Sequence, residues 1–309
     1  MITTVTLNAA VDKTYYVDKM VAGKVHRVSR VISEPGGKGN NVAKVVKLLG
    51  GEVTASGFVA GSNGAFIDHR LQEYGILTSF VSAKGESRTC LNIIDVSSNS
   101  STELLEQGPE IDPIHLDRFK KRLVELSLTS KYVVLSGSLP LGVPATTYSE
   151  LIHIVQSTNA RVYLDTSGPA LGEGLQAKPH FVKPNEEELA QWSGKEKMSD
   201  EQIVDAAAKL AGKGIRQVCV TLGARGTIAF IDGIGYRAIP PYVEAVNTVG
   251  CGDSFVAGMV FAEEQGESAA QRLRVATAAA CSNALSSKAG HFNNDVYQMY
   301  LHQVKIEVL

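Results

Sequence analysis

Short apolar runs rich in β-branched residues alternate with amphipathic segments of helical spacing from about residue 130 onward. This alternation is typical of a mostly parallel sheet sandwiched by helices, so we expect an α/β fold. Buried strands are predicted at 132–138, 160–167, 180–185 and 217–223. Each run ends in small or polar residues, and the carboxyl ends of such strands are where ligands usually bind.

The helices between these strands have recognisable starts. Asp112 followed by Pro113 opens one helix, and Ser199 with Gln202 forms the pattern of a capping box for another. Gly214 is expected to end the second of these helices. The last third of the chain is predicted to be helical as well, with small residues that favour close packing against the sheet.

Two segments, about 12–34 and 87–110, show strand alternation and turn residues but no helix between the strands. We expect them to form a small antiparallel β sheet beside the main fold. Because both are insertions that flank the α/β core, this sheet is interpreted as a lid that excludes water from a reaction centre. The alternative is a structural flap or a dimer surface without a catalytic role.

Composition narrows the classes of partner. The chain has 309 residues, 44% of them hydrophobic, and a formal net charge of −2. That charge gives no general attraction to nucleic acid or to an anionic membrane, so we expect a small-molecule ligand. The N-terminal residues lack a basic leader, and no uncharged stretch reaches the roughly 20 residues of a membrane span. A cytoplasmic location is therefore predicted.

The four cysteines, Cys90, Cys219, Cys251 and Cys281, are far apart and include no C-x-x-C pair. Neither a disulfide framework nor a zinc site is indicated by this spacing. We expect reduced thiols.

Two glycine-rich turns precede segments of helical spacing, "EPGGKGNNVAKVVKLLGG" at 34–51 and "NTVGCGDSFVAGM" at 247–259. Bare backbone at a helix start lets an anion approach the unpaired N–H groups. The first turn matches neither a Walker A loop nor a dinucleotide fingerprint, which argues against a dehydrogenase. Each turn could also be purely structural, and Asp253 in the second could be only an N-cap.

Two further stretches carry polar groups at predicted strand ends. In "VKPNEEEL" (182–189), Lys183 ends a strand, and Asn185 and Glu188 lie three apart at a helix start. Their oxygens could hold a hydrated Mg²⁺, or the two residues could form only a capping box. In "VTLGARGT" (220–227), a strand runs into a Gly-x-x-Gly turn against which a nucleotide could lie.

Taken in order, these elements resemble the ribokinase-like sugar kinases of the phosphofructokinase B group. "PGGKGNNVA" and "NTVGCGDSFVAG" match the two signatures of that family, and the resemblance covers essentially all 309 residues. It implies a single kinase domain over 1–309 with the lid described above. "TLNAAVDKTYYV", "GESRTC", "LEQGPEI" and "SGSLPLGVP" are most similar to the branch that contains 1-phosphofructokinase and tagatose-6-phosphate kinase.

The chain departs from the pattern of this branch at three positions. Ala9 stands where proline is usual in "TLNPA", and Leu141 stands where a second proline or another residue is common. Cys251 replaces the more frequent alanine or serine of the second signature. None of these changes removes a charged group.

The resemblance implies roles for particular residues. Asp253 would take the proton from the attacking sugar hydroxyl, while the N–H groups of Gly250, Cys251 and Gly252 stabilise charge on the transferring phosphoryl group. The substrate-binding residues would be Asp12, Gly37, Lys38, Asn41, Arg88 and Ser138, with Arg88 on the substrate phosphate. The nucleotide-binding residues would be Lys183, Asn185, Glu188, Thr221, Gly223, Gly226 and Asn283, and Asn185 and Glu188 would hold Mg²⁺ through water.

The implied activity is phosphorylation of a ketohexose monophosphate to a bisphosphate, with ATP and Mg²⁺ as cofactors. Fructose 1-phosphate is the favoured substrate, and tagatose 6-phosphate and fructose 6-phosphate are the alternatives. A kinase of a free sugar or nucleoside, and a phosphosugar-sensing protein without catalysis, are the rival hypotheses. The lid implies a homodimer by analogy with the family.

Overall fold

The computed structural model of the chain describes residues 1–98 and 100–309. Residue 99, which falls inside the expected lid, lies outside the described residues. The strands are β1 (Ile2–Thr6), β2 (Ala10–Val17), β3 (Arg30–Gly36), β4 (Val53–Ala60), β5 (Leu77–Ala83), β6 (Arg88–Asp95), β7 (Ser100–Leu105), β8 (Tyr132–Ser136), β9 (Arg161–Asp165), β10 (Phe181–Val182), β11 (Gln217–Thr221), β12 (Thr227–Ile231), β13 (Ile234–Ile239) and β14 (Lys305–Val308). The helices are α1 (Lys38–Leu48), α2 (Gly61–Glu73), α3 (Pro113–Thr129), α4 (Thr147–Gln156), α5 (Gly168–Gln176), α6 (Glu186–Trp192), α7 (Asp200–Gly212), the 3₁₀ helix η1 (Gly223–Arg225), α8 (Cys251–Glu264), α9 (Ala269–Ala284) and α10 (Asn294–Gln303).

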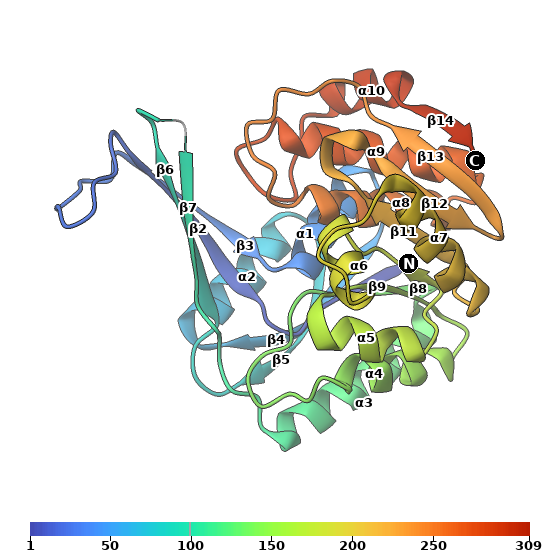
Figure 1. Ribbon diagram of the computed structural model, residues 1–309. Helices are drawn as coiled ribbons and strands as arrows, with labels where there is room; N and C mark the ends of the chain where they lie inside the picture. The colour runs from blue at the N-terminus through green and yellow to red at the C-terminus, as the bar shows by residue number, and fades with distance from the viewer. Residues whose placement is uncertain (99) are drawn as a thin grey trace.

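The main sheet has the strand order β14-β13-β12-β11-β10-β9-β8-β1-β4-β5 (Figure 1). The neighbouring strands β11, β10, β9, β8, β1, β4 and β5 pair in parallel, and β12, β13 and β14 extend the sheet in antiparallel pairs. The parallel strands β1, β4 and β8 are buried along their whole length. The apolar run of β8 predicts this, whereas β1 (ITTVT) and β4 (VTASGFVA) are buried although they contain small polar residues. The α/β class and the mostly parallel sheet predicted from the sequence are confirmed.

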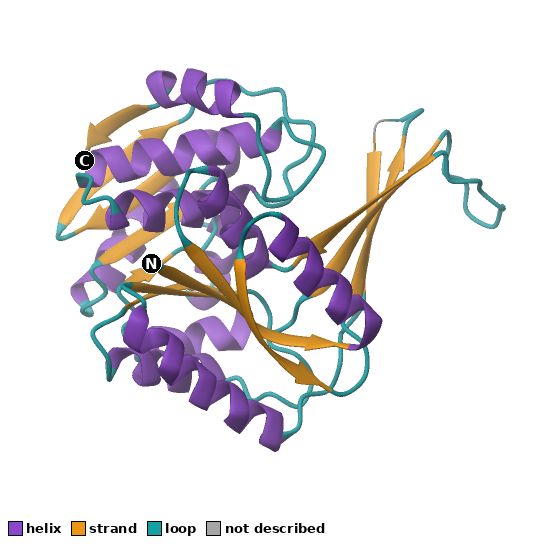
Figure 2. Ribbon diagram, turned by 180° about the vertical axis from the view of Figure 1, so that it is seen from behind, coloured by secondary structure: helices purple, strands orange, loops and turns teal. Residues whose placement is uncertain are grey.

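Helices cover both faces of this sheet (Figure 2). One buried cluster contains the apolar sides of α1, α2, α8, α9 and α10, and the other contains those of α3 to α7. The predicted helix starts are confirmed. The Asp112 side chain caps α3, and Ser199 and Gln202 form the capping box of α7. Across residues 1–98 and 100–309, every helix falls short of the length and hydropathy needed to span a bilayer.

The second sheet has the order β3-β2-β6-β7 and projects from the body (Figure 1). It coincides with the segments predicted to form the lid. Its two hairpins, β2–β3 and β6–β7, are antiparallel as expected, but the central pair β2–β6 is parallel. The reason is the connection, because the chain leaves β3 through α1, β4, α2 and β5 before it returns as β6, and a crossover of this kind joins parallel strands.

The carboxyl ends of the parallel strands meet along one edge of the main sheet, as they must when the strands run in the same direction. Asp165 ends β9, Lys183 follows β10, and Thr221 ends β11. The base of the lid lies at the same edge, since β2 follows β1 after only three residues. The fold therefore gathers polar groups from distant parts of the sequence between the sheet and the lid.

The opposite edge holds a buried polar cluster around Glu263, in the last turn of α8. Its carboxylate accepts hydrogen bonds from Arg161 at 3.0 Å, from Gln217 at 2.8 Å and from the hydroxyl of Tyr163, and it pairs with His180 at 2.9 Å. Burial alone would raise the pKa of Glu263, but His180 and the other partners lower it to about 2. This cluster ties the end of α8 to the sheet.

We expect Glu263→Gln to lower the free energy of unfolding at pH 7 by about 3 kcal/mol, because it breaks a buried charge network by removing one partner. The lowered pKa of Glu263 means that its stabilisation is complete above the ordinary value of 4.5 and is lost as the pH falls toward 2. The difference between wild type and variant should therefore narrow below pH 4.5. Urea unfolding at a series of pH values measures both effects.

Glu150→Gln is the matched control, because Glu150 forms an exposed ion pair with Lys120 at 2.7 Å. Exposed ion pairs contribute about 0–1 kcal/mol to the free energy of unfolding. An equal loss of stability in both variants would contradict the role assigned to the Glu263 cluster.

Candidate active site

A cavity of about 960 Å³ lies between the carboxyl edge of the sheet and the base of the lid. Its lining comes from the lid, from the starts of α1 and α8, from the ends of β10 and β11, and from the loops after β13 and α9. Most of the residues that the sequence singled out line it together. These are Asp12, Gly37, Lys38, Asn41, Arg88, Lys183, Asn185, Thr221, Gly223, Gly226, Gly250, Cys251, Gly252 and Asp253.

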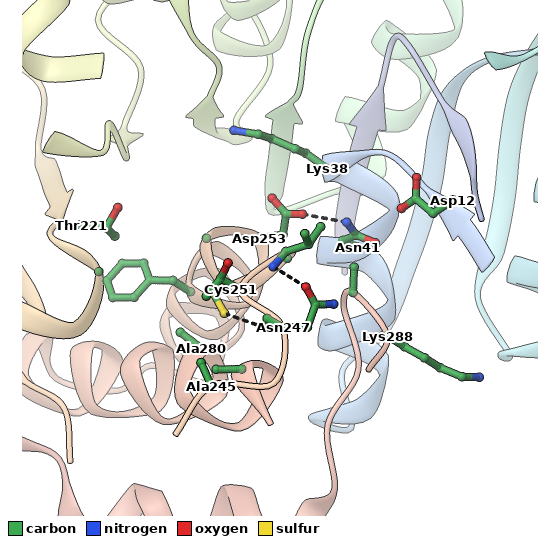
Figure 3. A pocket seen from close by; sticks show the side chains of 18 of the residues that line it. Asp12, Lys38, Asn41, Thr221, Ala245, Asn247, Cys251, Asp253, Ala280 and Lys288 are labelled. Carbon is green, nitrogen blue, oxygen red and sulfur yellow. Dashed lines mark hydrogen bonds between the residues drawn. The ribbon is translucent and has the colours of Figure 1, made fainter. Parts of the chain in front are cut away.

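Asp253 lies in the first turn of α8 and is buried. The Nδ2 atom of Asn41, from α1, donates to its Oδ2 atom at 2.8 Å (Figure 3). Burial raises the pKa of Asp253, while Lys38 and the bond from Asn41 act in the other direction. A buried carboxylate with a raised pKa and one fixed partner is a stronger and better oriented proton acceptor than a solvated one.

The start of α8 offers free backbone donors beside this carboxylate. Gly250 takes a left-handed conformation with φ 83°, and a Cβ there would lie 2.8 Å from the Gly290 nitrogen, so only glycine fits. No described side chain caps the helix. The Cys251 N–H donates to the Thr248 carbonyl at 3.3 Å, which leaves the N–H groups of Gly252 and Asp253 as the free donors of the first turn. Such a helix start attracts an anion.

Two lysines share one buried carboxylate next to this helix start. The Nζ atom of Lys183 lies 3.2 Å from Asp165, and that of Lys38 lies 3.4 Å from it. Burial would raise the pKa of Asp165, but the two lysines outweigh it and hold the pKa below its ordinary value. Asp165 in turn raises the pKa of Lys38. The ammonium group of Lys38 is therefore kept charged beside the cavity.

Asp165 itself was missed by the motif reasoning. The sequence did carry a signal, because Asp165 is the first charged residue after the apolar run "VYL" and ends a predicted buried strand. An acid at the carboxyl end of a parallel strand is placed for function or for holding a functional cation.

Glycine is needed where the lid meets α1. A Cβ at Gly36 would lie within 2.3 Å of the carboxylate of Asp12, which is two residues along β2 from Ala10, the strand partner of Gly36. Burial raises the pKa of Asp12 to about 6, although Lys44 and Arg88 oppose the shift. At Gly37, φ is 98° and a Cβ would meet Thr6 at 2.6 Å. The first glycine signature thus serves close packing as well as approach by a ligand.

Arg88 begins β6, beside Ala10 of β2, and faces the same cavity. Its guanidinium donates to two backbone carbonyls, that of Asn8 at 3.2 Å and that of Glu106 at 3.3 Å. No ion pair joins it to a carboxylate among residues 1–98 and 100–309. Its position is fixed, but its charge is not neutralised by a salt bridge.

The other end of the cavity is lined by Thr221, Gly223 and Gly226, with apolar residues from the loop after β13. A Cβ at Gly226, where φ is 91°, would lie 2.0 Å from a backbone oxygen, so this turn depends on glycine. Cys251 and Cys281 line the same region as free thiols. Burial raises the pKa of Cys251 to about 11 and that of Cys281 to about 12, which keeps both protonated at neutral pH.

Asn185 and Glu188 form the complete capping box of α6. The Glu188 N–H donates to Asn185 at 2.7 Å, and the Asn185 N–H donates to Glu188 Oε2 at 2.9 Å. The Oε1 atom of Glu188 makes no hydrogen bond to another described residue, so the box leaves one carboxylate oxygen for a water ligand. No cluster of three or more His, Cys, Asp or Glu side chains could bind a metal directly in the described part of the chain. The donor set thus fits a cation that keeps its own water.

Three of the predicted site residues do not belong to the described cavity lining. Glu188 is half-buried and bonds to Asn185 in the capping box, and Ser138 is exposed and accepts from Asn8 at 3.3 Å. Asn283 is fully buried. Its amide donates to the Val249 carbonyl at 2.9 Å and accepts from the Gly290 N–H at 2.8 Å, so it joins the loop before α8 to the loop after α9.

The family model for pfkB family carbohydrate kinases matches residues 5–295. The chain belongs to this family. It is therefore a carbohydrate kinase, an enzyme that transfers a phosphoryl group to a hydroxyl of a sugar.

Relatives of the chain agree with this assignment. A tagatose-6-phosphate kinase from Staphylococcus epidermidis is 33% identical over 309 residues, which is 99% of both chains. Phosphofructokinase-2 from Escherichia coli in complex with fructose-6-phosphate is 26% identical, with 98% of both chains covered and a TM-score of 0.90. The tetrameric inhibited form of the same protein is 27% identical with the same coverage and a TM-score of 0.91.

Proposed function

We propose that the enzyme transfers the γ-phosphoryl group of ATP to a ketohexose monophosphate. The observation that carries this proposal is Arg88, an arginine that faces the same cavity as Asp253 and forms no ion pair with any described residue. A planar guanidinium binds a phosphate dianion at two points, and a kinase of an unphosphorylated sugar has no use for such a group. Two backbone carbonyls hold the guanidinium in place before any ligand binds.

In this proposal Asp253 accepts the proton of the attacking hydroxyl. Its raised pKa strengthens it as a base, and the bond from Asn41 fixes the oxygen that Asp253 does not use for the proton. Asp12 lines the sugar side of the same cavity, where a carboxylate can hold hydroxyl groups by hydrogen bonds. The sugar would lie between Arg88 and Asp253 with its phosphate at the far end.

The phosphoryl groups would lie at the start of α8, where the free N–H groups and Lys183 offer positive charge. Phosphoryl transfer depends mainly on positioning and on neutralising charge, and both are supplied here by groups that the fold already holds in place. Mg²⁺, held through its water by Glu188 and Asn185, would supply further neutralisation on the phosphates of ATP.

Two observations favour different ketohexose monophosphates. The lid motif "LEQGPEI" favours tagatose 6-phosphate, whereas "TLNAAVDKTYYV" occurs on either side, and the relative with 33% identity is a tagatose-6-phosphate kinase. Fructose 6-phosphate is the ligand of a structural neighbour. All three place a phosphate at one end of a six-carbon chain and a primary hydroxyl at the other, so in this proposal each presents its phosphate to Arg88 and its hydroxyl to Asp253.

We expect a ketohexose monophosphate to give at least about 10-fold higher kcat/KM than free fructose, ribose or adenosine, because one charge-assisted contact contributes roughly 1.5–3 kcal/mol. The measurement is steady-state ADP release with Mg-ATP and fructose 1-phosphate, fructose 6-phosphate, tagatose 6-phosphate and the three unphosphorylated compounds. The same panel with Arg88→Ala should show a large rise in KM for the phosphosugar and little change for ATP. Preference for an unphosphorylated compound, or equal effects of Arg88→Ala on both substrates, would contradict the proposal.

Asp253→Asn should lower kcat by at least about 100-fold while sugar binding stays nearly unchanged, because a general base contributes about that factor. The raised pKa places the acidic limb of the wild-type kcat profile above the ordinary value of 3.8, and activity is lost as the pH falls through it. The pH profile of kcat for the Asp253→Asn variant should lack this acidic limb. Undiminished turnover would remove Asp253 from its proposed role.

We also propose that the lid mediates a homodimer. Its strands expose apolar side chains, including Val31 at 55%, Leu104 at 55% and Leu105 at 62%. Val31 and Leu104 lie on the face of the lid that points away from Asp12, whereas Leu105 is on the cavity face. An exposed apolar sheet face is usually covered by a partner. The tetrameric neighbour shows that a member of this family can assemble.

Sedimentation equilibrium of the wild type should give the mass of a dimer or a multiple of it, and Leu104→Lys should shift the mass toward one chain by burying a charge in the interface. Leu128→Lys is the control, because Leu128 is 71% exposed on α3, away from the lid. A monomeric wild type, or a dimer unaffected by Leu104→Lys, would overturn the lid interface.

A further inference from the structure

A second charged cluster joins the lid base to the loop that follows α9. The carboxylate of Glu34, on β3, is buried, and it pairs with the Nζ atom of Lys288 at 2.5 Å. The hydroxyl of Tyr74, just after α2, donates to its other oxygen at 2.5 Å. Burial would raise the pKa of Glu34, but Lys288, Tyr74 and Lys44 together lower it, so the carboxylate stays ionised.

Glu34 is the direct cross-strand partner of Asp12. Opposite residues of an antiparallel pair point to the same face of the sheet, and both residues line the cavity. A displacement of Glu34 therefore moves the strand pair that carries Asp12, the residue proposed to hold the sugar hydroxyls.

The loop that carries Lys288 is fastened to the catalytic side by several contacts. The buried Nζ atom of Lys44, on α1, donates to the Ala289 carbonyl at 2.8 Å. Asn283 joins the Gly290 N–H to the Val249 carbonyl, immediately before the start of α8. A Cβ at Gly290 would lie 2.9 Å from the backbone of Asn41, so this loop packs directly on the residue that bonds to Asp253.

Lys288 extends from this loop away from Asp253 (Figure 3). Its side chain is 35% exposed, whereas that of Glu34 is 8% exposed. The pair is thus a bridge between two parts of the site and is not itself placed at the reacting groups.

We infer that the Glu34–Lys288 ion pair is a brace that fixes the sugar-binding base of the lid relative to the helix start that carries Asp253. Glu34 and Lys288 are therefore positioning residues. This inference rests on the proposed roles of Asp12 and Asp253. A small misplacement between substrate and catalytic group costs much of the rate, up to about 100-fold for 1 Å. The pair therefore affects turnover more than it affects nucleotide binding.

The first test is a double-mutant cycle with Glu34→Gln and Lys288→Met, assayed with the sugar phosphate of highest kcat/KM. Each single variant should lower kcat by about 10-fold, with KM for Mg-ATP changed less than about threefold. The double variant should lose about 10-fold as well, because the two residues act as one unit. Lys288→Arg should retain most of the activity, since it preserves the ion pair.

Lys120→Met is the matched control, because Lys120 forms an ion pair with Glu150 at 2.7 Å far from the cavity. It should leave kcat unchanged. Losses that multiply to about 100-fold in the double variant, or a lowered melting temperature with unchanged kcat, would overturn the brace. Lys288→Gln replaces Lys288→Met in the cycle if the latter does not fold.

The second test needs no sugar, so it separates the brace from the proposed substrate class. Hydrogen exchange is followed by mass spectrometry with and without saturating Mg-ADP, in peptides that cover 30–36. Nucleotide should slow exchange of this lid-base strand in the wild type and in Lys120→Met but not in Lys288→Met. Equal slowing in all three proteins, or none in the wild type, would overturn the inference, whereas turnover of no sugar phosphate would remove only the proposed function.

Discussion

The site depends on one buried helix that is held at both ends. Helix α8 begins with Asp253 beside the cavity and reaches Glu263 in its last turn, roughly 15 Å further along at 1.5 Å per residue. Asn41 donates a hydrogen bond to Asp253, and the polar cluster at the starts of β9, β10 and β11 binds Glu263. Most of α8 between these residues is buried against α1 and α9. The carboxylate is therefore placed by the core and not by a loop.

The charges around this helix start are arranged to attract an anion without destabilising the empty site. Lys38 and Lys183 would repel each other if Asp165 did not lie between them, and the buried Asp165 would be unfavourable without the lysines. The two lysines thus place positive charge beside the cavity with little loss of folding stability. On the lid side, Lys44 holds a similar position among Asp12, Glu34 and Asp253, whose charges oppose the effect of burial on its pKa.

The sequence predicted the main features of the fold because the parallel strands β8, β9 and β11 have apolar runs and several of the helices have clear caps. It also identified most of the site residues that line the cavity, since glycine-rich turns and strand ends are signals that can be read from a short stretch of sequence. What it missed are contacts between distant segments. Asp165, Glu34 and Lys288 follow no short motif, and the buried bridging role of Asn283 depends on two loops that meet only in the folded chain. The parallel pairing of β2 with β6 was missed for the same reason, because it depends on the path of the chain between them.

That parallel pairing also sets an order of assembly. Residues 10–17 and 88–95 form the centre of the lid, and between them the chain builds α1, β4, α2 and β5, which belong to the main body. A contact over so long a loop is slow to form by itself, because the entropy of closing the loop has to be overcome first. Folding of the intervening units shortens that loop and brings β6 beside β2. We therefore expect the lid to be completed only after the half of the main sheet that carries it has formed.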